Sequence, residues 1–153
     1  MSDSQAILLR AEWHRASLRR LGCDPAFQPH VIIVNPQHVE VGDTVAINYF
    51  TMIVAFARIV IGNDVLIGPH VLIHSGNHRF ADSEARIREQ GHEQATINIE
   101  DDVWIGAGAI ILSGAKIGKG SVVSAGSVIS SEVSPFSVVA GNPGRVILNR
   151  KKN

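Results

Sequence analysis

A six-residue repeat runs through the second half of the chain and limits its possible folds more than any other feature. From residue 99 onward, a β-branched aliphatic residue returns at every sixth position: Ile99, Ile105, Ile111, Ile117, Val123 and Ile129. The position four residues after each of these is small or slender: Val103, Ala109, Ala115, Ser121, Ser127 and Val133. A flat strand alternates with a period of two, so this period indicates a short strand and a turn, repeated through Ser134.

The same six-residue pattern occurs twice earlier, in shifted registers. It appears as Ile61, Ile67 and Ile73, and before that as Val41, Ile47 and Ile53. Three strand-and-turn units would close one triangular coil, and parallel hydrogen bonds would stack the coils about 4.8 Å apart. The repeats predict an all-β parallel β-helix within residues 33–134, with whole coils at 41–58, 61–78, 99–116 and 117–134. A β-sandwich is the alternative, but its turns would be less regular.

The two ends of the chain depart from the repeat within what we interpret as a single domain, residues 1–153. Residues 4–21 are predicted to form a short helix that caps the first coil, with Ser2 and Gln5 as a capping box and Gly22 as its stop. Such a cap would cover strand edges that an open solenoid end exposes. Beyond Ser134, residues 135–153 form a C-terminal segment with a basic tail.

Charge and cysteine content argue against several classes of protein. The 14 Lys and Arg residues balance the 14 Asp and Glu residues, which gives no bulk charge to attract nucleic acid or a membrane. The uncharged stretches are too short to span a bilayer. Cys23 is the only cysteine, so no internal disulfide forms. We therefore expect a cytoplasmic protein that binds neither nucleic acid nor membrane.

The largest break in the repeat carries the residues best suited to chemistry. Residues 79–95 lack the pattern and are rich in charge, which predicts a loop extruded from the solenoid, and His78 stands at its root. Because the pKa of an imidazole lies near neutral pH, His78 is well placed to act as a general base. An ordinary surface histidine is the alternative interpretation.

The ordered segments IGNDVLIGPHVLIHSGNHRF, IEDDVWIGAGAIILSGAKIGKGSVVSAGSVIS and PFSVVAGNPGRVI carry a family resemblance. Across residues 41–147 the chain resembles the sugar O-acetyltransferase branch of the hexapeptide-repeat acyltransferases, which includes galactoside, maltose and polysaccharide O-acetyltransferases. The resemblance implies a left-handed β-helix, although general rules for parallel crossovers favour the right hand. It also implies that His78 deprotonates an acceptor hydroxyl, which attacks acetyl-CoA, and that Asn48 binds the acceptor.

Further residues of the acetyl-CoA site follow from the same resemblance. Ala107, three residues after Trp104, would supply a backbone N–H near the thioester, where it could stabilise an oxyanion. Other coenzyme contacts would fall on Ala125 and on the pair Ser130 and Ser131. Arg145 would lie near the phosphates, where a cation is electrostatically favourable. Members of the family are homotrimers with active sites between subunits, and we expect the same here.

Some positions depart from the family pattern, chiefly on the acceptor side. Acidic residues that relatives carry after an Ile-Val pair are replaced in the segment Ile53-Val54-Ala55-Phe56, and a second family Asn is Phe50. Ser130 and Ser131 replace a Thr-Lys pair, and Gly144 replaces an Ala. These changes favour a less polar acceptor than a galactoside, such as a partly acylated sugar, a nucleotide sugar or a polysaccharide precursor.

Two other functions are compatible with a β-helix. The γ-carbonic anhydrases share this fold and bind a metal through three histidines, two of them five residues apart. Here His70, His74 and His78 are spaced by four, so we expect no metal. A β-helix can also be a non-catalytic scaffold, in which case the chain would not bind acetyl-CoA.

Overall fold

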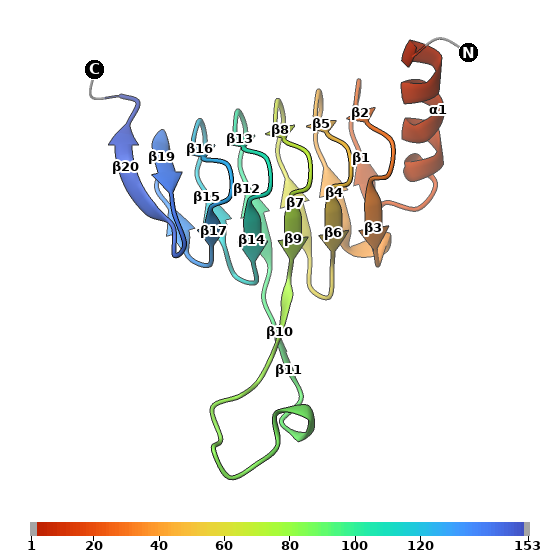
Figure 1. The fold of residues 1–153 in the computed structure, drawn as a ribbon. Coiled ribbons are helices and arrows are strands. Elements are labelled where there is room, and N and C mark those ends of the chain that lie inside the picture. Colours follow the sequence, from red (N-terminus) through yellow and green to blue (C-terminus); the bar gives the residue numbers. More distant parts are fainter. Residues whose placement is uncertain (1–2, 152–153) are drawn as a thin grey trace.

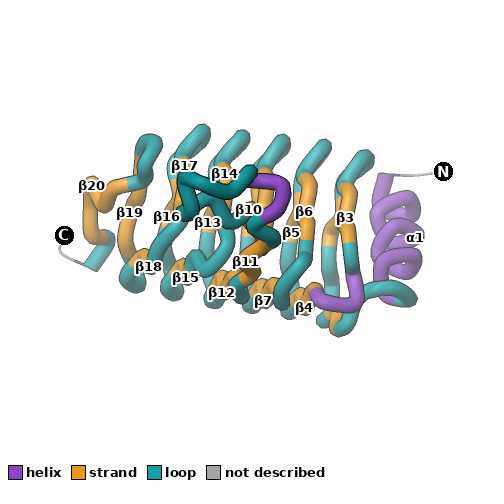
Figure 2. The backbone as a smooth tube through the Cα atoms, turned by 90° about the horizontal axis from the view of Figure 1, so that it is seen from below, coloured by secondary structure: helices purple, strands orange, loops and turns teal. Residues whose placement is uncertain are grey.

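The computed structural model describes residues 3–151, which form a triangular solenoid with a helix at one end and a long hairpin projecting from its middle (Figure 1). Three parallel sheets make the sides, and the fold is the predicted left-handed parallel β-helix. Sheet A contains β1 (Arg20–Leu21), β4 (Val39–Val41), β7 (Ile59–Ile61), β12 (Ile97–Ile99), β15 (Lys116–Ile117) and β18 (Glu132–Val133). Figure 2 shows the coils side by side along one axis.

The other two sheets complete each coil. Sheet B contains β2 (Ala26–Phe27), β5 (Ala46–Ile47), β8 (Leu66–Ile67), β13 (Trp104–Ile105), β16 (Val122–Val123), β19 (Ser137–Ala140) and the antiparallel β20 (Arg145–Asn149). Sheet C contains β3 (Ile32–Val34), β6 (Met52–Val54), β9 (Leu72–His74), β14 (Ile110–Leu112) and β17 (Val128–Ile129). We call the turns that join these sheets the A–B, B–C and C–A corners.

The six-residue pattern forms the core as predicted. Aliphatic residues from all three sheets point inward, and Ile47, Ile67 and Ile105 are completely buried. The slender residues four positions later, such as Val65 and Ala109, are also buried at the corners. One large and one small inward residue per side therefore fill the narrow triangular interior.

The solenoid begins earlier than predicted and loses its six-residue register near its end. An additional first coil runs from β1 to β3, and its inward residues Leu21, Phe27 and Ile33 also lie six apart. A Phe in place of Ile or Val makes this repeat less regular. At the other end Val133 pairs with Ile117, so the coil that begins at Ile117 takes 16 residues instead of the predicted 18.

The insertions all fall at the C–A corner. Glu40 pairs with both Arg20 and Val60, which gives two coils of 20 residues, and Val60 also pairs with Asn98, which gives one coil of 38. The extra residues include η1 (Pro36–His38) after the first coil and the projecting hairpin after the third. The A–B and B–C corners keep a constant length, so the inward positions remain aligned across the insertions.

The N-terminal helix α1 (Asp3–Arg15) is shorter than the predicted 4–21. It ends at Arg15 because the following chain joins sheet A, where Arg20 and Leu21 pair with Glu40 and Val41. Gly22 therefore lies in a corner and does not stop the helix. Ser2 of the predicted capping box lies outside the described residues.

The helix covers the open end of the first coil as expected. The Nε atom of Arg10 donates to the carbonyl oxygen of Phe27 at 2.7 Å, and Nη1 of Arg15 donates to that of Leu21 at 2.9 Å. Both carbonyls belong to edge strands that have no preceding coil to pair with. The helix thus donates hydrogen bonds to carbonyl groups at the exposed strand edges and also covers the apolar end of the core. Among residues 3–151, no helix is long and apolar enough to span a membrane.

His14 is buried beneath this cap, with 4% of its surface exposed, and its ring lies 4.5 Å from that of Phe27. Its Nδ1 atom has no hydrogen-bond partner, and burial lowers the pKa of its imidazole below the usual 6.5. The unfolded chain therefore binds a proton more readily than the folded one, and the free energy of unfolding falls as the pH drops through 6.5.

Replacing the imidazole in His14→Phe should flatten this decline in the free energy of unfolding, as measured by denaturant unfolding at several pH values. An unchanged decline would contradict the assignment.

Candidate active site

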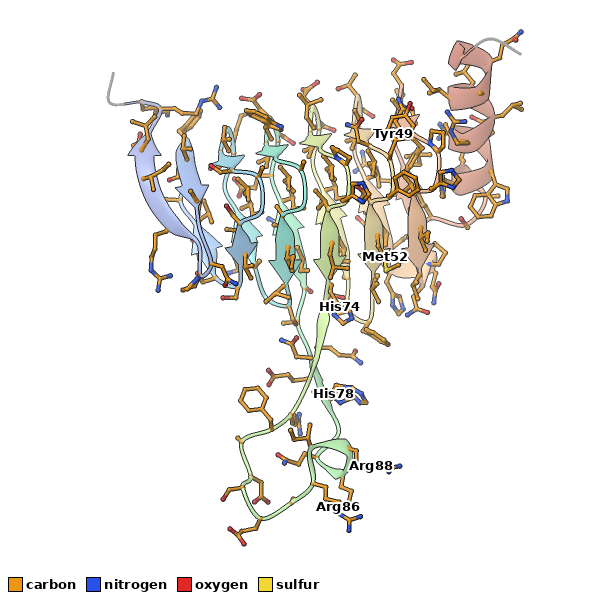
Figure 3. All side chains as sticks on the ribbon, viewed as in Figure 1. Tyr49, Met52, His74, His78, Arg86 and Arg88 are labelled. Atoms are coloured by element: carbon orange, nitrogen blue, oxygen red, sulfur yellow. The ribbon has the colours of Figure 1, made fainter. Side chains whose placement is uncertain are left out.

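The hairpin at the C–A corner presents His78 outside the solenoid. Its stem consists of β10 (Gly76–His78) and β11 (His92–Gln94), paired antiparallel, and its far end carries η2 (Ile87–Glu89). Figure 3 shows His74 near the body and His78 further along the stem, with Arg86 and Arg88 beyond it. The extruded loop predicted at 79–95 is therefore present, and its base is an ordered two-stranded stem.

Two serines anchor this stem to the solenoid. The buried Oγ of Ser75 accepts a hydrogen bond from the N–H of Ala57 and donates to its carbonyl oxygen, both at 2.9 Å. The Oγ of Ser113 accepts from the N–H of Ala95 at 2.9 Å and donates to the carbonyl oxygen of Ser75 at 3.1 Å. Both ends of the insertion are thus tied to neighbouring coils, at Ser75, three residues before His78, and at Ala95, three residues after His92.

Removing the buried anchor should weaken the whole domain. Ser75→Ala leaves the N–H and carbonyl of Ala57 without partners, which we expect to lower the free energy of unfolding by about 1–3 kcal/mol. Ser113→Ala, at a partly exposed position, should cost less. Urea unfolding of both variants tests this order, and a Ser75→Ala protein as stable as the wild type would show that the anchor is dispensable.

His78 shares a pocket with two further histidines. It pairs across the stem with His92, and their ring centroids are 4.3 Å apart with the planes tilted by 43°. A pocket of about 230 Å³ is lined by Phe56, His74, Gly76, Asn77, His78, His92 and Gln94. Sequence reasoning missed His92. The register that matches residue 78 with residue 92 does not follow from the predicted loop 79–95, whose centre would match residue 78 with residue 96.

Phe56 forms the body side of this pocket. Its ring lies 5.6 Å from that of His74, and it packs so closely on Gly76 that a Cβ there would meet the ring at 2.9 Å. This is the segment in which the acidic residues of the relatives are absent. The pocket around His78 is therefore bounded by aromatic and amide groups. A larger hollow of about 540 Å³ lies within the loop beyond it and is lined by charges of both signs.

The donor-side residues lie elsewhere on the solenoid. Ala107 and Ala125 are exposed at the B–C corner of successive coils, where the carbonyl oxygen of Ala107 accepts from the N–H of Gly126 at 2.9 Å. The N–H groups of Gly106 and Gly108 donate to neighbouring coils, whereas that of Ala107 donates no hydrogen bond within residues 3–151. A backbone donor that is not used within the described residues therefore lies at the predicted position.

The remaining donor-side residues occupy two other places. Trp104 is 54% exposed on the outer face of sheet B, between Leu66 and Val122, and so lies on a strand and not at a corner. Ser130, Ser131 and Arg145 line a small hollow at the C-terminal end of the solenoid. The structure thus brings these three together, separate from Ala107 and Ala125.

A single chain does not bring the two halves of the predicted site together. Asn48 lies at the B–C corner, where its Nδ2 donates to the carbonyl oxygen of Ile67 at 2.9 Å. Figure 3 places the neighbouring Tyr49 at the opposite end of sheet C from His74 and His78. Ala107 shares the corner of Asn48, so His78 and its predicted partners lie at opposite ends of the sheet. Within residues 3–151, no cluster of three or more His, Cys, Asp or Glu side chains could hold a metal ion.

Comparison with known proteins gives a consistent family. The family model for the bacterial transferase hexapeptide (six repeats) matches residues 96–131. Nodulation protein L of Rhizobium meliloti is 36% identical over 145 residues, which cover 88% of this chain and 74% of that protein. Galactoside O-acetyltransferase of Escherichia coli is 32% identical over 121 residues, 78% of this chain and 58% of that enzyme.

A solved structure agrees along the whole solenoid. The hexapeptide-repeat acetyltransferase of Vibrio cholerae in complex with acetyl-CoA superposes with a TM-score of 0.89 at 33% identity, covering 99% of this chain and 81% of that one. The chain belongs to the hexapeptide-repeat acetyltransferase family, in the branch that contains the galactoside and maltose O-acetyltransferases. The chain spans little more than half the length of some curated relatives. It is 35% identical over 124 residues to a candidate acetyltransferase of Schizosaccharomyces pombe, and these residues cover 80% of this chain and 58% of that protein.

Proposed function

We propose that this protein transfers the acetyl group of acetyl-CoA to a hydroxyl of a sugar or polysaccharide precursor, with His78 as the general base. The observation that carries the proposal is the exposed imidazole of His78 on an anchored stem, beside a pocket of about 230 Å³. The acetyl-CoA complex of the Vibrio cholerae relative supports the choice of donor.

The chemistry needs one base and one oxyanion donor. His78 takes the proton of the acceptor hydroxyl while the oxygen attacks the thioester carbon, because an alcohol is a weak nucleophile until it is deprotonated. The N–H of Ala107, which donates no hydrogen bond within residues 3–151, stabilises the oxyanion of the tetrahedral intermediate. When that intermediate collapses, the carbon–sulfur bond breaks, the thiolate leaves, and the imidazolium of His78 returns the proton to sulfur.

The coenzyme would lie along the C-terminal half of the solenoid. Ala107 and Ala125 would border the thioester arm, and Trp104 would offer an apolar surface beside it. Ser130 and Ser131 would add hydroxyl contacts, and the guanidinium of Arg145 would pair with a phosphate. No residue in this arrangement calls for a metal.

The outer face of sheet C supports assembly into a homotrimer. One row across its five strands is wholly apolar: Ile32, Met52, Leu72, Ile110 and Val128. Sheet A instead presents Arg20, Glu40, Asn98, Lys116 and Glu132, with Val60 between Glu40 and Asn98. A threefold assembly that buries the sheet C face would place His78 of one chain near Ala107 of another. This would complete the site that one chain leaves divided.

The acceptor is expected to be less polar than a galactoside. Val54 is buried and Phe56 lines the His78 pocket, at positions near which relatives carry carboxylates for sugar hydroxyls. An acceptor with an apolar substituent would lose less hydration on entering this pocket.

The proposal is tested by incubating the protein with acetyl-CoA and a panel of sugars, nucleotide sugars and partly acylated sugars, with detection of free CoA thiol. We expect acceptor-dependent thiol release with at least one member. Stoichiometric zinc in protein purified without added metal would favour a hydratase instead. A protein that fails to bind acetyl-CoA at millimolar concentration would be a scaffold.

A further inference from the structure

A column of aromatic rings occupies the B–C corner of the first three coils. His30, Phe50 and His70 are exposed and take equivalent positions in successive coils. The ring centroids of His30 and Phe50 are 4.8 Å apart with 6° between planes, and those of Phe50 and His70 are 5.1 Å apart with 10°. The column therefore has one flat ring per coil, stacked along the solenoid axis.

The column stops at His70, although the backbone would allow it to continue. The next two positions are Gly108 and Gly126, whose N–H groups donate to the preceding coil as that of His70 does. Their φ angles of 65° and 69° resemble the 57–64° of His30, Phe50 and His70, so this left-handed conformation does not by itself require glycine here. A Cβ at Gly108 or Gly126 would meet no atom within 4 Å. The place of the next ring is open space.

This open position adjoins the proposed point of acetyl transfer. Gly108 directly follows Ala107, whose N–H is the proposed oxyanion donor. Asn48, the proposed acceptor ligand, lies at the same corner two residues before Phe50. A group stacked on His70 above Gly108 would therefore lie between the acceptor ligand and the thioester.

We propose that the position above Gly108 binds an unsaturated ring of the acceptor, a nucleobase or aryl group, stacked on the imidazole of His70. This inference rests on the proposed function and narrows its acceptor class. The column favours a planar ligand because the preceding rings are nearly parallel and about one coil apart, and stacked aromatic groups attract one another at such distances.

The test uses benzyl alcohol and cyclohexylmethanol, which share a hydroxyl and a carbon count but differ in ring saturation. With histidine-labelled protein and millimolar probe, the NMR signals of the His70 ring should shift upfield with benzyl alcohol and much less with cyclohexylmethanol. His70→Ala should weaken benzyl alcohol binding about tenfold, measured by calorimetry. Equal shifts with both probes, no shift with either, or unchanged affinity in His70→Ala would overturn the inference.

A matched pair of glycine variants localises the ring. Gly108→His should fill the open position and abolish the His70 shift, whereas Gly126→His, one coil further away, should leave it. A shift that survives in a folded Gly108→His protein would overturn the assignment. The binding readout does not depend on turnover. Thiol release without this ring binding would refute the inference alone, whereas ring binding without thiol release from any acceptor would refute the proposed function.

Discussion

His78→Ala should reduce acetyl transfer by a factor of at least ~10², because the proposed mechanism uses its imidazole as the general base. Its affinity for acetyl-CoA should stay unchanged, since the proposed coenzyme contacts lie at the far end of sheet C and on the C-terminal coils. Thiol release with saturating acetyl-CoA measures the first effect, and equilibrium dialysis of the coenzyme measures the second.

His92→Phe is the matched control for this substitution. It keeps an aromatic ring against His78 across the stem but cannot accept a proton. We expect less than about a tenfold loss, with turnover still dependent on His78. If His92→Phe lost as much activity as His78→Ala, or if His78→Ala retained turnover, the base would have to be reassigned.

Leu72→Lys should dissociate the assembly. Leu72 lies in the middle of the apolar row on sheet C, between Met52 and Ile110. An unpaired charge buried there would cost roughly 3–5 kcal/mol, which weakens association by a factor of about 10²–10⁴. Sedimentation should then show single chains at concentrations where the wild type is trimeric, and acetyl transfer should fall with dissociation.

Val60→Lys on sheet A is the control for the interface. Val60 precedes the buried Ile61 as Leu72 precedes the buried Ile73, but it lies on the charged outer face of sheet A, where Glu40 pairs with Arg19 and Arg58, and this face is exposed in the proposed assembly. This variant should remain trimeric and active. A wild type that sediments as a single chain with full activity would contradict the shared site altogether.

Most of the fold could be predicted from the sequence, because each short strand needs an inward aliphatic residue at every sixth position, and insertions at the corners do not remove this requirement. That requirement identified the coils from Val41 onward and the insertion after His78. The first coil was not predicted, because Phe27 there takes the place of the β-branched residue. The helix was predicted to extend to Leu21, whereas α1 ends at Arg15. In both cases the ladder with the next coil decides the structure, and local propensity does not report such tertiary pairing.

The candidate site was less predictable because its residues come from separate coils. The loop drew attention to His78, but its partner His92 depends on an antiparallel pairing that the solenoid pattern does not contain. The ring column of His30, Phe50 and His70 was missed for a similar reason. These residues are 20 positions apart, and only the stacked coils bring them into contact.

Co-expression of two inactive variants tests the central claim most directly. His78→Ala lacks the base, and Ala125→Trp should block acetyl-CoA beside Ala107. If each site takes His78 from one chain and Ala107 from the next, random mixing in equal amounts should restore about a quarter of the wild-type specific activity, because one interface in four joins two intact halves. Mixed assemblies that stay inactive would show that the proposed catalytic site is not shared between chains.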